Sequence, residues 1–389
     1  MTQPFDPAEV CDQLLANPDL DPADLPALRA ATEQALAALH AESLVSAEGL
    51  DRQLRIFRGS IDKLAAITAD RRRHPEIAEV EVAPPIFITG LGRSGTTFLH
   101  SLLSRDPDNR APLVWETQYP SPPPEAASYE TDARIEQCAR YFASGPVSPK
   151  DDVSNVEMQK KHMNGPLLTE EDNAMMSAAM RSIPLGSGVR ILNYTHWLLE
   201  QDGRIAYGVH KRWLQHLQWR NPRPRWLLKA PTHIHNLPAL FATYPNAKIV
   251  WCHRDPAEVI SSMTSLLCTF RKSFMSVIDP PAIAMEMINY WTSGLRRGMA
   301  YRREHLEAPI FDIGHTGIVS EPLDAVRQIY GAFDIRLTPQ AERALAAFVD
   351  ENPREKHGAH SHGIERYGFT QTRIHEIFDD YVEEFGTYF

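Results

Sequence analysis

The chain has 389 residues, of which 40 are Lys or Arg and 50 are Asp or Glu, so its formal net charge is −10. An acidic balance of this size argues against nonspecific binding to nucleic acid or to an anionic membrane surface. Because the chain is acidic, any anionic ligand must be held by local donors. The length suits one principal α/β domain with a helical elaboration.

The first ten residues, MTQPFDPAEV, lack the basic start and apolar run of a secretion signal. No later segment reaches the roughly 20 apolar residues that cross a bilayer. The four cysteines lie far apart without a CxxC pair, which predicts neither a disulfide framework nor a zinc site. We therefore expect a cytoplasmic protein without a membrane span.

Residues from about 22 to 73 carry apolar side chains at helical spacing, among them Leu28, Ala31, Ala35 and Ala38. This pattern predicts helices, and we expect residues 1–83 to form a helical extension packed on the core. The remaining residues, 84–389, are then the main domain.

Four short apolar runs, at residues 86–88, 226–228, 249–252 and 310–313, are predicted strands, and helical patterns follow them. Alternation of strands and helices predicts an α/β fold with a parallel sheet of the P-loop type flanked by helices. Residues 115–219 lack the alternation and are expected to be a helical insertion at an acceptor site. Its apolar side chains are either a pocket wall or core packing: Met175, Met176, Met180 and Trp197.

Residues 90–97 read GLGRSGTT and follow the first predicted strand directly. Glycines allow backbone amides to turn inward, and the start of the next helix attracts an anion to the same point. A loop that binds magnesium and a triphosphate carries Lys where this chain has Thr96, and here the cation comes earlier, at Arg93. The loop therefore favours a less charged anion such as a phosphosulfate, held by Gly90, Arg93, Ser94, Gly95, Thr96 and Thr97.

The combination PIFITGLGRSGTT at residues 85–97, LKAPTH at 228–233 and HRDP at 253–256 resembles the bacterial branch of the sulfotransferases. These enzymes use 3′-phosphoadenosine 5′-phosphosulfate (PAPS) and release 3′-phosphoadenosine 5′-phosphate (PAP). The resemblance runs from about residue 90 to the C-terminus. It implies in-line transfer of a sulfuryl group from PAPS to a hydroxyl or amine of a small-molecule acceptor.

The resemblance also implies a site for the 3′-phosphate of the donor. In the family an Arg after a later strand and a Ser two helical turns further hold this group, and Arg254 and Ser262 match that spacing. Residues eight apart on a helix share one face, so the two side chains can hold one anion.

Sulfuryl transfer needs a base for the acceptor proton and a cation for the developing negative charge. Lys229 and His233 resemble the Lys and His of the family's catalytic element, although two residues separate them here. Glu116 is a competing base, because carbohydrate sulfotransferases place a glutamate a little over 20 residues past the loop cation. The choice between His233 and Glu116 stays open.

Two rival functions remain at this point: a P-loop kinase or nucleotide hydrolase, and a noncatalytic nucleotide-binding protein. The lack of the loop lysine weighs against the first, for which Asp312 is the nearest imitation of a metal-binding acid. His357, His360 and His362 invite a metal site, but their glycine neighbours favour a loop, and no metal is expected. An apolar or aromatic alcohol is a candidate acceptor, and the oligomeric state is left open.

Overall fold

The computed structural model describes residues 5–143, 165–352 and 363–389 of the chain. The protein divides into two compact units, each built from separate stretches of sequence. The first unit comprises residues 1–82, 113–222 and 266–278, and the second comprises 83–112, 223–265 and 279–389. The expected division at residue 83 stays a prediction.

The first unit is helical, and capping residues define where its N-terminal helices begin. The Asp6 side chain accepts a hydrogen bond from Ala8 N at the start of α1, and the Ser46 side chain accepts one from Gly49 N at the start of α3. Leu28, Ala31 and Ala35 lie buried along α2, as their helical spacing predicts. The principal helices of this unit are α1 (Pro7–Leu14), α2 (Leu25–Glu42), α3 (Ala47–Arg73), α5 (Val114–Gln118), α6 (Ala133–Ala143), α8 (Asn173–Ser177), α9 (Leu192–Leu199) and α10 (Arg204–Gln218).

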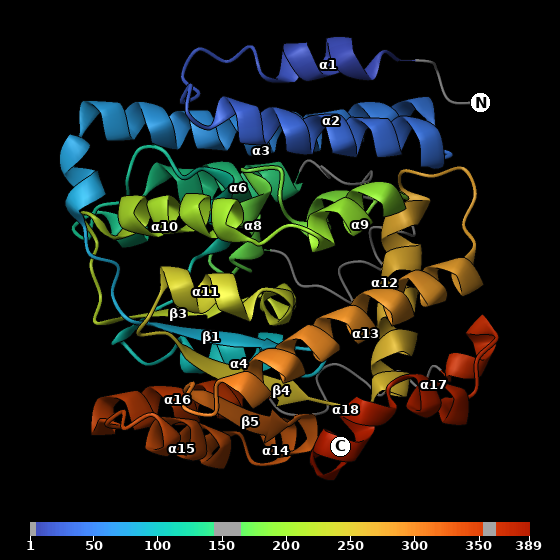
Figure 1. The fold of residues 1–389 in the computed structure, drawn as a ribbon. Coiled ribbons are helices and arrows are strands. Elements are labelled where there is room, and N and C mark those ends of the chain that lie inside the picture. Colours follow the sequence, from blue (N-terminus) through green and yellow to red (C-terminus); the bar gives the residue numbers. More distant parts are fainter. Residues whose placement is uncertain (1–4, 144–164, 353–362) are drawn as a thin grey trace. The chain divides into compact units, whose positions relative to one another are not determined.

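The second unit contains a five-stranded parallel sheet with strand order β2-β3-β1-β4-β5 (Figure 1). Alternate residues of the strands face a core shared with α4, α15 and α16, and Ile86, Ile88 and Val250 are among them. The strands are β1 (Pro85–Gly90), β2 (Asn109–Arg110), β3 (Arg225–Lys229), β4 (Lys248–His253) and β5 (Ile310–Gly314).

Helices follow each of the longer strands and flank the sheet, which confirms the predicted α/β fold. They are α4 (Thr96–Leu103), α11 (Leu237–Thr243), α12 (Pro256–Lys272), α13 (Pro280–Glu304), α14 (His315–Ser320), α15 (Pro322–Ala332), α16 (Pro339–Glu351), α17 (Gln371–Ile377) and α18 (Asp379–Phe385), with the 3₁₀ turn η4 (Pro231–His235) after β3. All four predicted strands are present. Strand β2 was not predicted, because two residues are too short to show a periodicity.

Candidate active site

The loop after β1 adopts backbone conformations that need its glycines. Gly90 has φ of 124° and Gly95 has φ of 88°, in the region that favours glycine. A methyl group on Gly90 would lie only 2.2 Å from the Cys252 carbonyl oxygen of β4. Arg93, between these glycines, also has a positive φ, of 65°. The chain then enters α4 at Thr96, so the loop lies at the N-terminus of a helix, where an anion is favoured.

Arg93, Arg254 and Ser262 are brought together in the second unit. Arg93 Nε donates to Ser262 Oγ at 3.3 Å, and Arg254 Nη1 donates to the Arg93 carbonyl oxygen at 2.8 Å. Desolvation and then repulsion from Arg254 lower the pKa of the Arg93 guanidinium. Two neighbouring cations of this kind are stabilised by an anion between them. The arrangement therefore suits a phosphate or sulfate group beside the loop.

Lys229 is the last residue of β3, at the carboxyl end of the parallel strands, where the loop also lies. Its ammonium donates to Thr97 Oγ1 at 3.3 Å, and the residue is 3% exposed. The ammonium is thus held at the start of α4, close to the hydroxyls predicted to hold the donor.

His233 lies on η4, and its ring packs edge-on against Phe87 of β1, with 4.8 Å between ring centroids. The residue is 1% exposed. Thr89 Oγ1 donates to the carbonyl oxygen of Pro231 at 3.1 Å, which ties the turn to the loop-bearing strand. A base must come within hydrogen-bonding distance of the acceptor proton, so His233 needs an opening toward the acceptor.

Glu116 belongs to the first unit, at the start of α5. Its Oε2 accepts hydrogen bonds from Leu113 N at 3.0 Å and from the Tyr129 hydroxyl at 2.8 Å, and the residue is fully buried. These contacts are those of a carboxylate that caps a helix start. Glu116 therefore has a structural role as a helix cap, in addition to the catalytic role predicted for it.

Asp312 is engaged in a partly buried ion pair. Arg302 donates to its carboxylate at 2.5 Å, and His253 Nε2 donates to it at 2.9 Å, while His253 Nδ1 accepts from the Tyr381 hydroxyl at 3.1 Å. Burial by itself would raise the pKa of Asp312, but these two partners lower it. A carboxylate paired in this way does not match the magnesium-binding acid of a P-loop kinase.

His315 lies beside the loop and was not predicted from the sequence. It follows β5, and a methyl group on Gly95 would lie 3.2 Å from His315 Cδ2, so the imidazole lies against the loop. The available signal was its place directly after the fourth predicted strand, since ligands collect at the carboxyl ends of parallel strands.

The apolar side chains predicted either as acceptor wall or as core are mostly buried in the first unit. Met175, Met176 and Met180 are at most 7% exposed, and Trp197 stacks on Tyr194 with 6.1 Å between centroids. Burial of this degree fits core packing. His357, His360 and His362 lie outside the described residues.

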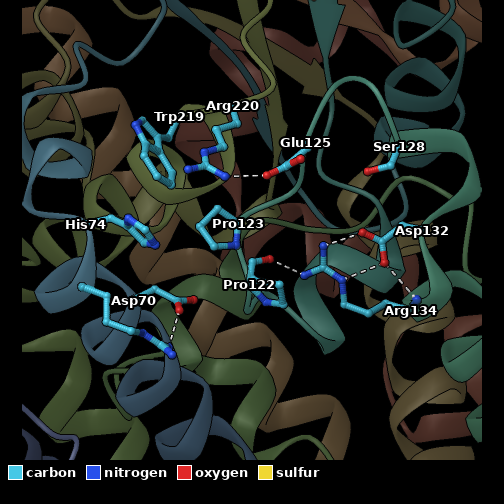
Figure 2. A pocket seen from close by; sticks show the side chains of 11 residues that line it. Asp70, His74, Pro122, Pro123, Glu125, Ser128, Asp132, Arg134, Trp219 and Arg220 are labelled. Atoms are coloured by element: carbon cyan, nitrogen blue, oxygen red, sulfur yellow. Dashed lines mark hydrogen bonds and ion pairs between the residues drawn. The ribbon is translucent and has the colours of Figure 1, made fainter.

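A cavity of about 290 Å³ is lined by residues of the first unit. Figure 2 shows the side chains that line it. Its charged side chains are paired with one another: Asp70 with Arg73 at 2.5 Å, Glu125 with Arg220 at 2.5 Å, and Asp132 with Arg134 at 2.6 Å. None of the predicted site residues lines it. Elsewhere in the described ranges, no group of three or more His, Cys, Asp and Glu side chains could hold a metal ion.

Comparison with known proteins decides the family. A sequence model described as "Sulfotransferase family" matches residues 84–339, which include the loop, Lys229, Arg254 and Ser262. The chain belongs to this sulfotransferase family. It is an enzyme that transfers a sulfuryl group, as the motifs predict.

Relatives of this sulfotransferase include mycobacterial proteins. The omega-hydroxy-beta-dihydromenaquinone-9 sulfotransferase Stf3 of Mycobacterium tuberculosis is 24% identical over 321 residues, which are 78% of this chain and 77% of the relative. The structure of STF1 from Mycobacterium tuberculosis superposes with a TM-score of 0.82 and 26% identity, over 97% of this chain and 99% of STF1. The structure of STF9 from Mycobacterium avium superposes with a TM-score of 0.87 and 23% identity, over 99% of this chain and 97% of STF9. None of the described helices of this sulfotransferase is long and apolar enough for a membrane crossing.

Proposed function

We propose that the sulfuryl donor is PAPS, with the 5′-phosphosulfate in the loop at residues 90–97 and the 3′-phosphate between Arg254 and Ser262. The observation that carries this proposal is the chain of contacts from Ser262 through Arg93 to Arg254, which joins the loop to the start of α12. An anion bound there would contact groups from both elements. A nucleotide with a phosphate at each end supplies the two anions.

Lys229 is proposed to stabilise the oxygen that bridges sulfur and the 5′-phosphate. In the reaction the acceptor oxygen or nitrogen forms a bond to sulfur while the bond from sulfur to the bridging oxygen breaks, and PAP leaves with the electron pair. Negative charge collects on that oxygen, where a fixed ammonium is most useful. The contact of Lys229 with Thr97 places its cation beside the loop.

Ligand-dependent unfolding tests the donor. PAP at 100 times its Kd should stabilise the protein by about 2.7 kcal/mol. Adenosine 5′-monophosphate, which lacks the 3′-phosphate, is the matched control and should bind much more weakly. Stabilisation by ATP with magnesium but not by PAP would favour a kinase or hydrolase instead. Tight PAP binding without transfer to any acceptor would favour a noncatalytic nucleotide-binding protein.

His233 and Glu116 are the two proposed bases. Alanine in place of the base should abolish turnover and leave PAP affinity nearly intact, because the base contacts the acceptor. We favour His233, since Glu116 already accepts two hydrogen bonds. The comparison of His233→Ala with Glu116→Gln decides between them, and full activity of one variant removes that residue from the role.

We propose a hydroxyl on a largely apolar small molecule as the acceptor. The relative Stf3 is named for a hydroxylated menaquinone derivative, which is a molecule of this class. A cytoplasmic location is part of the proposal, because the four cysteines form no disulfide. Incubation of enzyme and PAPS with an extract of apolar metabolites, followed by mass spectrometry for sulfated products, identifies the acceptor. Sulfation restricted to sugars would contradict this class.

A further inference from the structure

His235, at the end of η4, is a buried side chain that leaves both ring nitrogens without a hydrogen bond. The residue is 4% exposed, and neither Nδ1 nor Nε2 has a partner in the described part of the chain. A buried polar atom without a hydrogen-bond partner destabilises the folded protein. Other contacts must therefore hold the ring at this place.

Aromatic packing on α13 holds that ring. The imidazole stacks on Tyr290 with 4.2 Å between centroids and lies 5.9 Å from the Trp291 ring. Gly294 makes room one turn further along the helix, because a methyl group there would lie 2.4 Å from His235 Nε2. His235, Tyr290 and Trp291 thus form one aromatic cluster, which we call the α13 cluster.

Trp291 is the residue of the α13 cluster that packs against the loop. A methyl group on Gly92 would lie 3.4 Å from Trp291 Cζ2 and 2.9 Å from Met263 Sδ, so both side chains pack against this glycine. Gly92 immediately precedes Arg93, which has the left-handed backbone conformation and contacts Ser262. Trp291 itself is 3% exposed.

We infer that Trp291 is a positioning residue for sulfuryl transfer, which sets the backbone at Gly92 so that Arg93 points at the donor. This inference rests on the proposed donor site. A rigid indole wedged between His235 and Gly92 leaves the loop no space to move toward α13. Without it, Arg93 can leave its strained left-handed conformation. Trp291 acts through Arg93 and does not touch the donor.

The test is a double-mutant cycle on the full chain. In Trp291→Phe the smaller ring leaves a gap beside Gly92. We expect this gap to lower kcat and to weaken PAP binding, each by about tenfold to a hundredfold. Gly92→Ala alone should also reduce both, because its methyl group meets Met263 and Trp291. In the double variant the methyl group occupies part of the gap, so the loss should be smaller than the product of the two single losses.

Trp251→Phe is the matched control. Trp251 is a fully buried tryptophan of the same unit, its Nε1 has no hydrogen-bond partner among the described residues, and its ring packs against His253 and Phe385. Its effects should multiply with those of Gly92→Ala. Tryptophan fluorescence adds a second readout: PAP should change the emission of the wild type and of Trp251→Phe, and change that of Trp291→Phe less.

The outcomes separate the two proposals. A wild type that binds no PAP overturns the donor proposal and the positioning role with it. A wild type that binds PAP, together with a Trp291→Phe variant of unchanged kcat and Kd or with purely multiplicative effects in the cycle, overturns the positioning role alone. Circular dichroism and unfolding of each variant show which losses come from misfolding.

Discussion

The guanidinium of Arg254 contacts two groups among the described residues, and substitutions can test each contact separately for its effect on donor binding. Its guanidinium donates to the Arg93 carbonyl oxygen and pairs with Glu258 at 2.8 Å. Hydrogen bonds to charged groups contribute about 1.5–3 kcal/mol, so Arg254→Gln should weaken PAP binding by roughly 10- to 150-fold. The affinity for adenosine 5′-monophosphate should change much less.

Glu258→Gln is the control for that measurement. The side chain of Glu258 is 59% exposed and, among the described residues, pairs with Arg254, so PAP affinity should be unchanged or higher in this variant. Isothermal titration of both nucleotides measures the effect. Equal loss of both affinities in Arg254→Gln would contradict a role at the 3′-phosphate.

Lys229 should affect the chemical step more than donor binding. Lys229→Met keeps most of the side-chain volume but removes the ammonium beside Thr97. Loss of a group that stabilises the leaving oxygen lowers kcat by about 10²- to 10³-fold. Single-turnover kinetics with saturating PAPS give the rate, and titration with PAP gives the affinity. A large fall in PAP affinity at unchanged kcat would assign Lys229 to binding only.

At the scale of elements, Gly90 makes the close passage of β1 past β4 possible. Gly90→Ala places a methyl group 2.2 Å from a backbone oxygen and requires a side chain at φ of 124°. The conformation alone costs about 1–3 kcal/mol, and the backbone clash adds to it. Denaturant unfolding should show a loss of at least that size. Gly331→Ala in α15 is the control, because nothing lies within 4 Å of its added methyl group.

The elements that the sequence predicts are those with local signals. Apolar runs predicted β1, β3, β4 and β5, and helical spacing predicted α2. The loop at residues 90–97 was recognisable because glycines and hydroxyls are needed at fixed positions. Contacts between residues far apart in sequence were not predictable. Asp312 with His253 and His315 against Gly95 are examples, because each depends on how strands and helices pack.

The same limit applies to Glu116. Its distance from Arg93 in the sequence suggested a base, whereas its hydrogen bonds with Leu113 N and the Tyr129 hydroxyl depend on the fold of α5. The spacing of two residues in the sequence cannot show which hydrogen-bond partners a carboxylate has in the fold.

At the scale of the whole molecule, buried neutral histidines make the fold sensitive to acid. Burial lowers the pKa of His216 in the first unit to about 4 and the pKa of His235 in the second unit to about 3. Because unfolding returns each pKa to about 6.5, the unfolded chain binds more protons below that pH. The free energy of unfolding should therefore fall as the pH decreases from about 6.5 toward 4.

Urea unfolding at a series of pH values measures this dependence. His235→Phe should flatten it, because the substitution removes one of the buried groups whose pKa is lowered. A free energy of unfolding that is constant between pH 6.5 and 4 would contradict the assignment of neutral buried rings.

The thiols of the protein differ in their accessibility. Cys11, Cys138 and Cys252 are fully buried, and burial raises the pKa of each thiol, whereas Cys268 on α12 is half-buried. Reactivity follows the accessible thiolate. A maleimide dye should thus attach to the native wild-type enzyme at a single position, Cys268. The natural sequence already supplies a labelling handle for fluorescence or spin-probe studies, without a cysteine-free background.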